Sequence, residues 1–238
     1  MLWRTMLKAT GVITTLAAGL VGLWLVSRST TYQVFGDIHA RVTTTEKIVA
    51  LTFDDGPVPK HLDAVLGTLQ AHDIPATFYL VGQDAVRHPD LVQRIFNNGH
   101  EIGNHSFTHP RLLLMTQRRI AAEIEQTDQA LREAGYTGPL TFRPPYGKKL
   151  IGLPAYLARN QRASIMWSLA PEQWTGPIEE RVARVRREIT PGAIILLHIM
   201  FDHGQGARDM LDPLITALKA DGYRFVTLSA LLAAHAPE

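Results

Sequence analysis

Cysteine is absent from this 238-residue chain. Disulfide bonds, thiolate metal sites and cysteine nucleophiles are therefore excluded, and any bound metal must be held by histidine, aspartate or glutamate. Long basic blocks are also absent, and the 24 lysines and arginines nearly balance the 22 aspartates and glutamates, so the charge pattern does not indicate a nucleic-acid partner. With 46% apolar residues, the chain can bury one core, which predicts a single domain of catalytic size.

A long apolar run is present near the N-terminus, from Ala9 to Val26, and Arg4 and Lys8 precede it. As a helix the run would be about 27 Å long, close to the thickness of a bilayer core. We therefore predict a membrane anchor in residues 1–27, in the cell membrane, with the N-terminus inside and the catalytic domain outside. The alternative is a cleaved signal that leaves a secreted or periplasmic protein, although no A-x-A-like cleavage site follows the run.

The rest of the chain divides into a Ser/Thr-rich stretch at 28–46, predicted to be a linker, and a domain at 47–238. In the domain, apolar strand-like runs alternate with helical stretches, which predicts an α/β fold with a mostly parallel sheet. A barrel of seven or eight β/α units suits this length. The strand-like runs are "IVALTF", "ATFYLVG", "HEIGNH", "ASIMWSL", "AIILLH" and "RFVTL".

Polar side chains stand where several of these runs end. Asp54 and Asp55 follow "IVALTF", His105 closes "HEIGNH", Arg143 follows "LTF", and His198 ends "AIILLH". Parallel α/β folds place reactive residues at the carboxyl ends of their strands. We therefore expect these side chains to converge on one rim.

The adjacent carboxylates of Asp54 and Asp55 repel each other, and burying both is costly unless a cation or hydrogen bonds compensate. His105 and His109 are four residues apart, a spacing that puts both imidazoles on one side of the segment. Two histidines and one carboxylate form a facial metal site with open positions. The pair of carboxylates can then coexist, with one binding the metal and the other acting as a base.

Three other candidates each have a structural alternative. The segment "FRPPYG" is either a rigid turn or a loop that brings Arg143 to a carboxylate and presents a backbone N–H to an oxyanion. His198 is either a hydrogen-bonded core residue or a general acid. Trp174 belongs either to the core or to the wall of a sugar-binding pocket.

Taken together, "TFDDGP", "HEIGNHSFTHP", "FRPPYG", a tryptophan-bearing segment and "ILLH" resemble the polysaccharide deacetylase family, the chitooligosaccharide-deacetylase homology domain of carbohydrate esterases. The resemblance extends from about Lys47 to Leu232. It implies a distorted (β/α)7 barrel. It also implies that Asp55, His105 and His109 bind a divalent metal, most often Zn²⁺, and that Asp54 is the catalytic base.

The resemblance implies further roles around this centre. Arg143 would orient Asp54, the backbone N–H of Tyr146 would help to bind the oxyanion, and His198 would protonate the leaving nitrogen. Substrate contacts would come from Leu196 at the acetyl methyl group, from Trp174 and from Pro145.

The implied activity is metal-dependent removal of N-acetyl groups from a polysaccharide or oligosaccharide of the GlcNAc type, with peptidoglycan and poly-N-acetylglucosamine favoured. Two alternatives use the same site. One is an O-acetyl esterase on acetylated polysaccharide, and the other is a weakly active glycan-binding protein that retains the metal. The oligomeric state is left open.

One motif departs from the family pattern. Where a D-x-x-D-W type segment is usual, this chain has "SLAPEQW", so Ala170 and Gln173 occupy the expected aspartate positions. Neutral Gln173 cannot stabilise an imidazolium as a carboxylate does. We therefore expect His198 to be protonated less often near neutral pH, unless Glu172, one residue earlier, takes this role.

Overall fold

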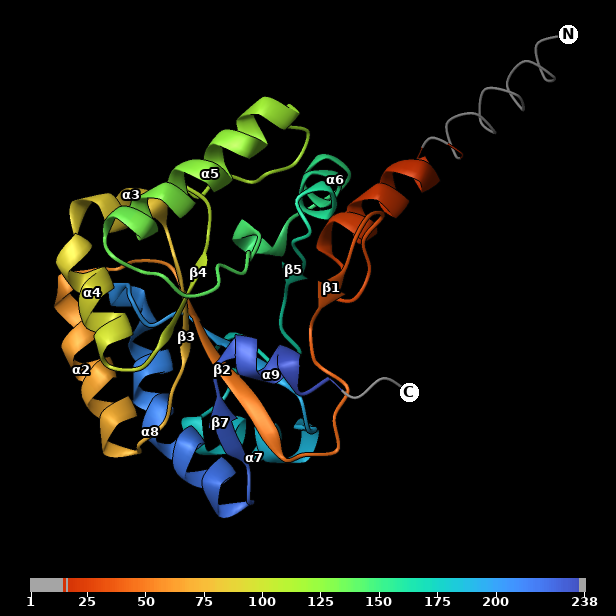
Figure 1. Ribbon diagram of the computed structural model, residues 1–238. Helices are drawn as coiled ribbons and strands as arrows, with labels where there is room; N and C mark the ends of the chain where they lie inside the picture. Colours follow the sequence, from red (N-terminus) through yellow and green to blue (C-terminus); the bar gives the residue numbers. More distant parts are fainter. Residues whose placement is uncertain (1–14, 16, 236–238) are drawn as a thin grey trace, which may run out of the picture.

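A computed structural model describes residue 15 and residues 17–235 (Figure 1). Its centre is strand β2 (Ile48–Asp54), whose seven residues are all buried. Every pairing of β2 is parallel, which confirms the predicted parallel α/β fold. The other strands of this five-stranded sheet are β3 (Thr77–Leu80), β4 (Glu101–Asn104), β6 (Ile194–Leu197) and β7 (Arg224–Val226).

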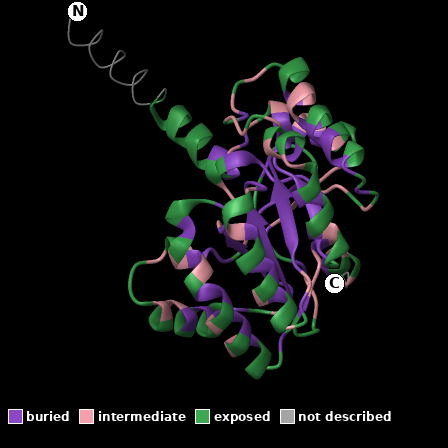
Figure 2. Cartoon of the chain, turned by 90° about the vertical axis from the view of Figure 1, so that its left-hand side faces the viewer, coloured by how far each residue is buried: buried purple, intermediate pink, exposed green. Residues whose placement is uncertain are grey.

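Helices cover both faces of the sheet, and their apolar sides meet the buried strands (Figure 2). Val49, Leu51 and Phe53 of β2 point into the main core, whereas Ile48 and Ala50 point to the opposite face. The two-residue period of a strand causes this alternation. The helices are α2 (Pro59–Ala71), α3 (Gly82–Arg87), α4 (Pro89–Asn97), α5 (Gln117–Glu133), α6 (Gly152–Arg159), α7 (Ile178–Glu188), α8 (Gln205–Ala220) and α9 (Leu228–Ala233), with 3₁₀ turns η1 (Pro145–Gly147), η2 (Pro171–Gln173) and η3 (Asp202–Gly204).

The predicted seven-stranded barrel does not close among the described residues. Strands β1 (Ile38–His39) and β5 (Ser164–Ile165) form a separate parallel pair, and single-residue bridges through Phe142 join β5 to β4. Phe142 and Arg143 are followed by two prolines, which have no N–H to donate to a neighbouring strand. This segment therefore cannot extend its pairing into a full strand.

The predicted membrane anchor is wrong for the part of residues 1–27 that the structure describes, and with it the predicted cell-membrane location. Residues 17–28 are helical, but no helix in the described part of the chain is long and apolar enough to cross a bilayer. A span needs about 20 apolar residues. Residues 1–14 and 16 of the predicted anchor lie outside the described residues.

The stretch at 28–46, predicted to be a linker, contributes to the folded domain. Strand β1 pairs with β5, and Val42 is 2% exposed. The N–H of Val42 donates to the carbonyl of Gly192 at 2.9 Å. Gly192 has a φ of +79°, and a Cβ there would lie 1.8 Å from the carbonyl oxygen of Val42, so the contact requires glycine.

Lys149 links the segment before β1 to the rest of the domain through hydrogen bonds. Its side chain is fully buried, and its ammonium donates to the carbonyl of Ser29. Its backbone N–H donates to the carbonyl of Ser27 at 3.2 Å. The helix at 17–28 therefore ends against the Pro-rich loop that carries η1.

Candidate active site

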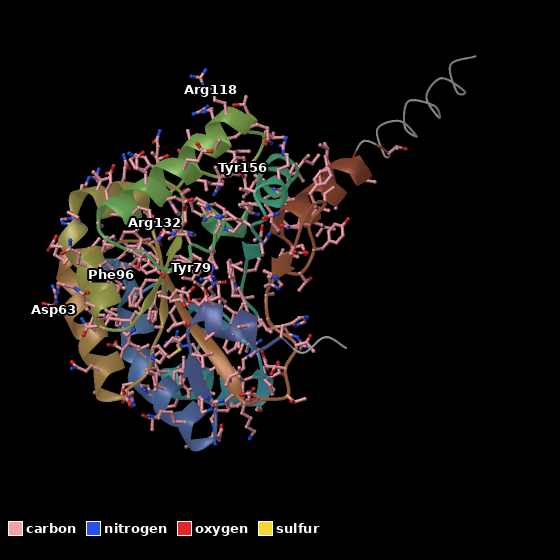
Figure 3. The ribbon with its side chains drawn as sticks, viewed as in Figure 1. Asp63, Tyr79, Phe96, Arg118, Arg132 and Tyr156 are labelled. Carbon is pink, nitrogen blue, oxygen red and sulfur yellow. The ribbon has the colours of Figure 1, made fainter. Side chains whose placement is uncertain are left out.

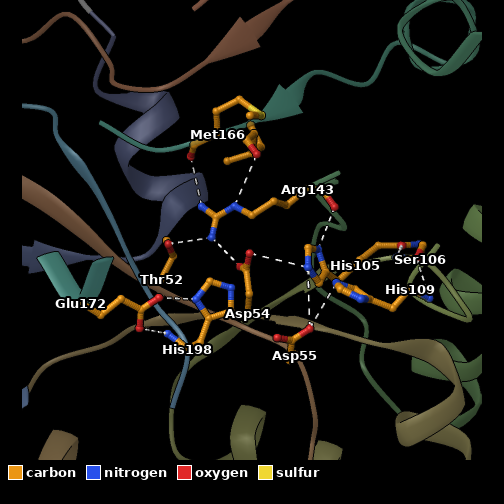
Figure 4. A network of polar contacts seen from close by, with 12 residues as sticks. Thr52, Asp54, Asp55, His105, Ser106, His109, Arg143, Met166, Glu172 and His198 are labelled. Atoms are coloured by element: carbon orange, nitrogen blue, oxygen red, sulfur yellow. Dashed lines mark hydrogen bonds and ion pairs between the residues drawn. The ribbon is translucent and has the colours of Figure 1, made fainter. Parts of the chain in front are cut away.

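The carboxyl ends of the central strands carry the site, and Asp54 lies at its centre (Figure 4). Asp54 and Thr52 are on the same face of β2 because they are two residues apart. Asp55 turns away from the strand with a φ of 78°, a conformation that few non-glycine residues adopt. The backbone thereby aims two consecutive carboxylates at different partners.

Arg143 holds Asp54 in place. Its Nη1 donates to Asp54 Oδ1 at 2.6 Å and to Thr52 Oγ1 at 2.8 Å, and Nη2 donates to the carbonyl of Met166 at 3.1 Å. The guanidinium carbon lies 4.1 Å from the ring centre of Tyr79, which Figure 3 labels near the middle of the molecule. Burial alone would raise the pKa of Asp54, but the Arg143 guanidinium holds this pKa below its usual range. Asp54 is therefore an ionised carboxylate although it is only 2% exposed.

Asp55, His105 and His109 form the predicted cluster of possible metal ligands. One ligand atom from each lies within 4.8 Å of the others. His109 Nε2 is 3.4 Å and His105 Nε2 is 3.9 Å from Asp55 Oδ1. His105 Nδ1 lies 2.8 Å from the carbonyl of Arg143, which can only accept, so the proton is on Nδ1 and the Nε2 lone pair faces the carboxylates.

The electrostatics of the cluster fit a cation. Burial and the neighbouring charge of Asp54 raise the pKa of Asp55 to about 7, and burial lowers the pKa of His105 to about 4. A neutral imidazole is the form that binds a metal. A cation bound by these groups would offset the repulsion between the two carboxylates.

His198 lies on the other side of Asp54 and is paired with Glu172. The carboxylate of Glu172 contacts His198 Nδ1 and also accepts the backbone N–H of His198 at 2.6 Å. Burial opposes protonation of His198, but the hydrogen bond that its ring donates to Glu172 and the charge of Asp54 raise its pKa to about 9. The expectation that Gln173 leaves His198 without a carboxylate is therefore wrong. The 3₁₀ turn η2 places Glu172, the residue before Gln173, against His198.

Because Glu172 already pairs with His198 and Gln173 is exposed, we expect Gln173→Asp to change the rate of the N-deacetylation that the resemblance implies by no more than about twofold. The alkaline limb of the pH profile should stay in place. Initial rates of acetate release between pH 6 and pH 10 test this. A faster variant with an alkaline limb at higher pH would mean that Glu172 does not supply enough charge.

The remaining predicted residues are placed as follows. Tyr146 has a φ of 57°, and its ring centre lies 4.6 Å from that of His109. Leu196 pairs with Thr52 in register and shares its face of the sheet. Pro145 is buried beside Tyr146. Trp174 packs against the main core, with the Arg184 guanidinium 4.1 Å from its ring centre, so its role in substrate binding stays a prediction.

A cavity of about 560 Å³ opens over this group. Its walls include Asp55, His109, Tyr146 and His198, together with side chains that the sequence patterns did not single out. The latter are Val81, Gln83, Asp84, Arg87, Thr108, Phe201 and His203. Thr52 was also missed, although its position two residues before Asp54 puts it on the same strand face.

Comparison with known proteins agrees with this geometry. The polysaccharide deacetylase family profile matches residues 41–160. A peptidoglycan-N-acetylglucosamine deacetylase of Bacillus cereus is 38% identical over 186 residues, covering 77% of this chain and 67% of the relative. A chitooligosaccharide deacetylase of Bradyrhizobium is 35% identical over 210 residues, covering 83% of this chain and 94% of the relative. The chain therefore belongs to the polysaccharide deacetylase family, as its motifs predict.

Two further comparisons show what share of a relative's length this chain covers. The chain spans 39% of the peptidoglycan-N-acetylglucosamine deacetylase PgdA of Listeria monocytogenes, at 36% identity. A crystal structure of the Bc1960 peptidoglycan N-acetylglucosamine deacetylase superposes with a TM-score of 0.76 and 33% identity, covering 83% of this chain and 93% of that one. Relatives named for deacetylating N-acetylglucosamine polymers thus share both sequence and fold with this chain.

Proposed function

We propose that this polysaccharide deacetylase removes N-acetyl groups from GlcNAc-type polysaccharides, with peptidoglycan as the first candidate. One observation carries the proposal. Asp54, a carboxylate held by Arg143, lies between the Asp55, His105 and His109 cluster and His198, a histidine held by Glu172 (Figure 4). Amide hydrolysis requires a base, an acid and a group that polarises the carbonyl, and these residues suit those three tasks.

Asp55, His105 and His109 would hold a divalent cation, for which we propose Zn²⁺ because two imidazoles and one carboxylate are a common ligand set of catalytic zinc. When bound, the ion would polarise the amide carbonyl and lower the pKa of a water molecule. Burial keeps His105 neutral, which leaves its Nε2 available as a ligand.

Asp54 accepts the proton of the attacking water, because Arg143 fixes the orientation of its carboxylate and Asp55 is committed to the cation. His198 gives a proton to the leaving nitrogen, and Glu172 keeps it protonated. The backbone N–H of Tyr146 donates to the oxyanion. Leu196 provides an apolar contact for the acetyl methyl group.

Acetate release separates this proposal from its alternatives. The substrates are peptidoglycan, N-acetylated chitooligosaccharides and O-acetylated xylan, each tested with metal-depleted enzyme and after addition of Zn²⁺. Release from the first two that depends on added metal is the expected result. Release from xylan alone would indicate an O-acetyl esterase, and release from none would indicate a glycan-binding protein.

We expect His109→Ala to abolish one-to-one binding of Zn²⁺, because Asp55 and His105 alone cannot hold the ion in an open site. Metal content after dialysis, measured by elemental analysis, tests this without relying on activity. His72→Ala is the matched control, because His72 follows the last residue of α2 and pairs with Asp212 at 2.8 Å. Full zinc occupancy in His109→Ala would remove the assignment.

A further inference from the structure

Three cationic side chains gather on the rim beside the cavity, and the proposed chemistry uses none of them. We call Arg28, Arg111 and Lys148 the rim cluster. Arg28 and Arg111 are exposed, and Lys148 is partly exposed. The three come from segments far apart in the sequence, so the fold, not local sequence, brings them together.

Backbone and ring contacts place the rim cluster. Ser27 and Ser29, on both sides of Arg28, bond to Lys149, which puts Arg28 beside Lys148. The Arg111 guanidinium carbon lies 5.1 Å from the ring centre of Tyr146, two residues before Lys148. Partial burial and the charges of Arg28 and Arg111 lower the pKa of Lys148, as expected for crowded cations.

No carboxylate neutralises these charges within the described part of the chain. Neither arginine nor Lys148 forms a salt bridge there, although many other basic residues do. On the cavity wall formed by α3, Arg87 pairs with Asp84 at 3.0 Å and so adds little net charge. The uncompensated positive charge near the cavity is therefore on the Tyr146 side.

The position of Tyr146 connects the rim cluster to the site. The Tyr146 ring packs against the His109 ring, lines the cavity, and makes a cation–π contact with the Arg111 guanidinium. A polymer whose reacting unit occupies the cavity, and whose next units leave over Tyr146, would pass Arg111 and then Lys148 and Arg28. Unpaired cations along such a path attract anions on the polymer.

We propose that the rim cluster binds carboxylates on the units next to the reacting sugar, so that this chain selects acidic N-acetylated glycans over neutral ones. This inference rests on the proposed function and narrows its substrate class. The carboxylates belong either to the sugar units or to peptides attached to them. The recognised chemistry is the same in both cases.

The test compares substrates with and without carboxylate charges. The first pair is chitohexaose and the same oligomer carboxymethylated on its 6-hydroxyl groups, which carries the charge on sugar. The second pair is peptide-bearing peptidoglycan strands before and after amidation of the peptide carboxylates. Both the Kd of fluorescently labelled substrate and the KM and kcat of acetate release are measured.

We expect tighter binding and lower KM for the charged member of at least one pair, and the pair that responds identifies the source of the carboxylate. Arg111→Gln and Lys148→Gln should each raise the Kd of that charged substrate about threefold and the double variant about tenfold, as for exposed ion pairs. The neutral partner should respond less. Salt at about 1 M, where the Debye length is about 3 Å, should remove the preference.

Arg187→Gln is the matched control, since Arg187 is exposed and lies beside Lys47 and Tyr223, at the amino ends of β2 and β7. It should leave the preference unchanged. Equal Kd values within both pairs, or equal losses on charged and neutral substrates in the variants, would overturn the inference. Charge-dependent binding without any acetate release would support the inference and reject the proposed function.

Discussion

Asp54→Asn should lower kcat by about 10²–10⁴-fold while the protein still binds one equivalent of metal. The amide cannot accept the proton of the attacking water, but it has the shape of the carboxylate and leaves Asp55, His105 and His109 intact. Elemental analysis for zinc and steady-state rates of acetate release measure the two effects. The loss should appear in kcat more than in KM, because Asp54 acts in the transition state.

Asp55→Asn is the matched variant, because it makes the same chemical change one residue later. It should weaken metal binding, and added Zn²⁺ should restore part of its activity. Asp54→Asn also removes the carboxylate partner of buried Arg143, so thermal unfolding of both variants is needed to exclude a folding defect. If Asp54→Asn loses the metal and Asp55→Asn keeps it, their roles are reversed.

Glu172→Gln should move the alkaline limb of the pH–rate profile to lower pH and reduce the amide hydrolysis rate at pH 8 by about 10-fold or more. As general acid, His198 is active when protonated, so its contribution is present below its pKa and is lost as pH rises through that pKa. Glu172 contributes to raising this pKa to about 9 from the ordinary 6.5. Without the carboxylate, the pKa falls and the active form is lost at lower pH.

The profile is measured with an N-acetyl substrate and with an O-acetyl ester, because an alkoxide leaves with less need of a proton than an amine. The amide rate should fall more than the ester rate. Glu179→Gln removes the same charge from an exposed position on α7 and should leave the profile unchanged. An unshifted limb in Glu172→Gln would mean that His198 is not the acid.

Much of the site could be predicted because strand ends in a parallel sheet meet at one edge. Asp54, His105, Arg143 and His198 each follow an apolar run, and the structure brings all four together. Glu172 could not be assigned in the same way. Its orientation depends on the 3₁₀ turn that begins at Pro171. The motif comparison points to Gln173, one residue later, and does not reveal that turn.

The sequence predicts the fold class, a parallel α/β sheet, but not whether this sheet closes into a barrel. Alternating apolar runs identify the parallel sheet, whereas pairing near Phe142 depends on the two prolines that follow Arg143 and on two-residue strands. The Ser/Thr-rich stretch at 28–46 lacks periodicity, because its contribution consists of one short strand, three scattered buried side chains at Gln33, Ala40 and Val42, and backbone hydrogen bonds. Such contacts leave little trace in a hydrophobic pattern.

The attachment of Lys149 to Ser29 decides where a recombinant fragment of this protein can begin. A fragment cut at residue 47 would lose strand β1, the Val42 side chain and the carbonyl that accepts the Lys149 ammonium. The Lys149 ammonium would then lose its hydrogen-bond partner, beside the loop that carries Tyr146. A fragment for crystallisation or for the assays above should therefore start no later than Ser27.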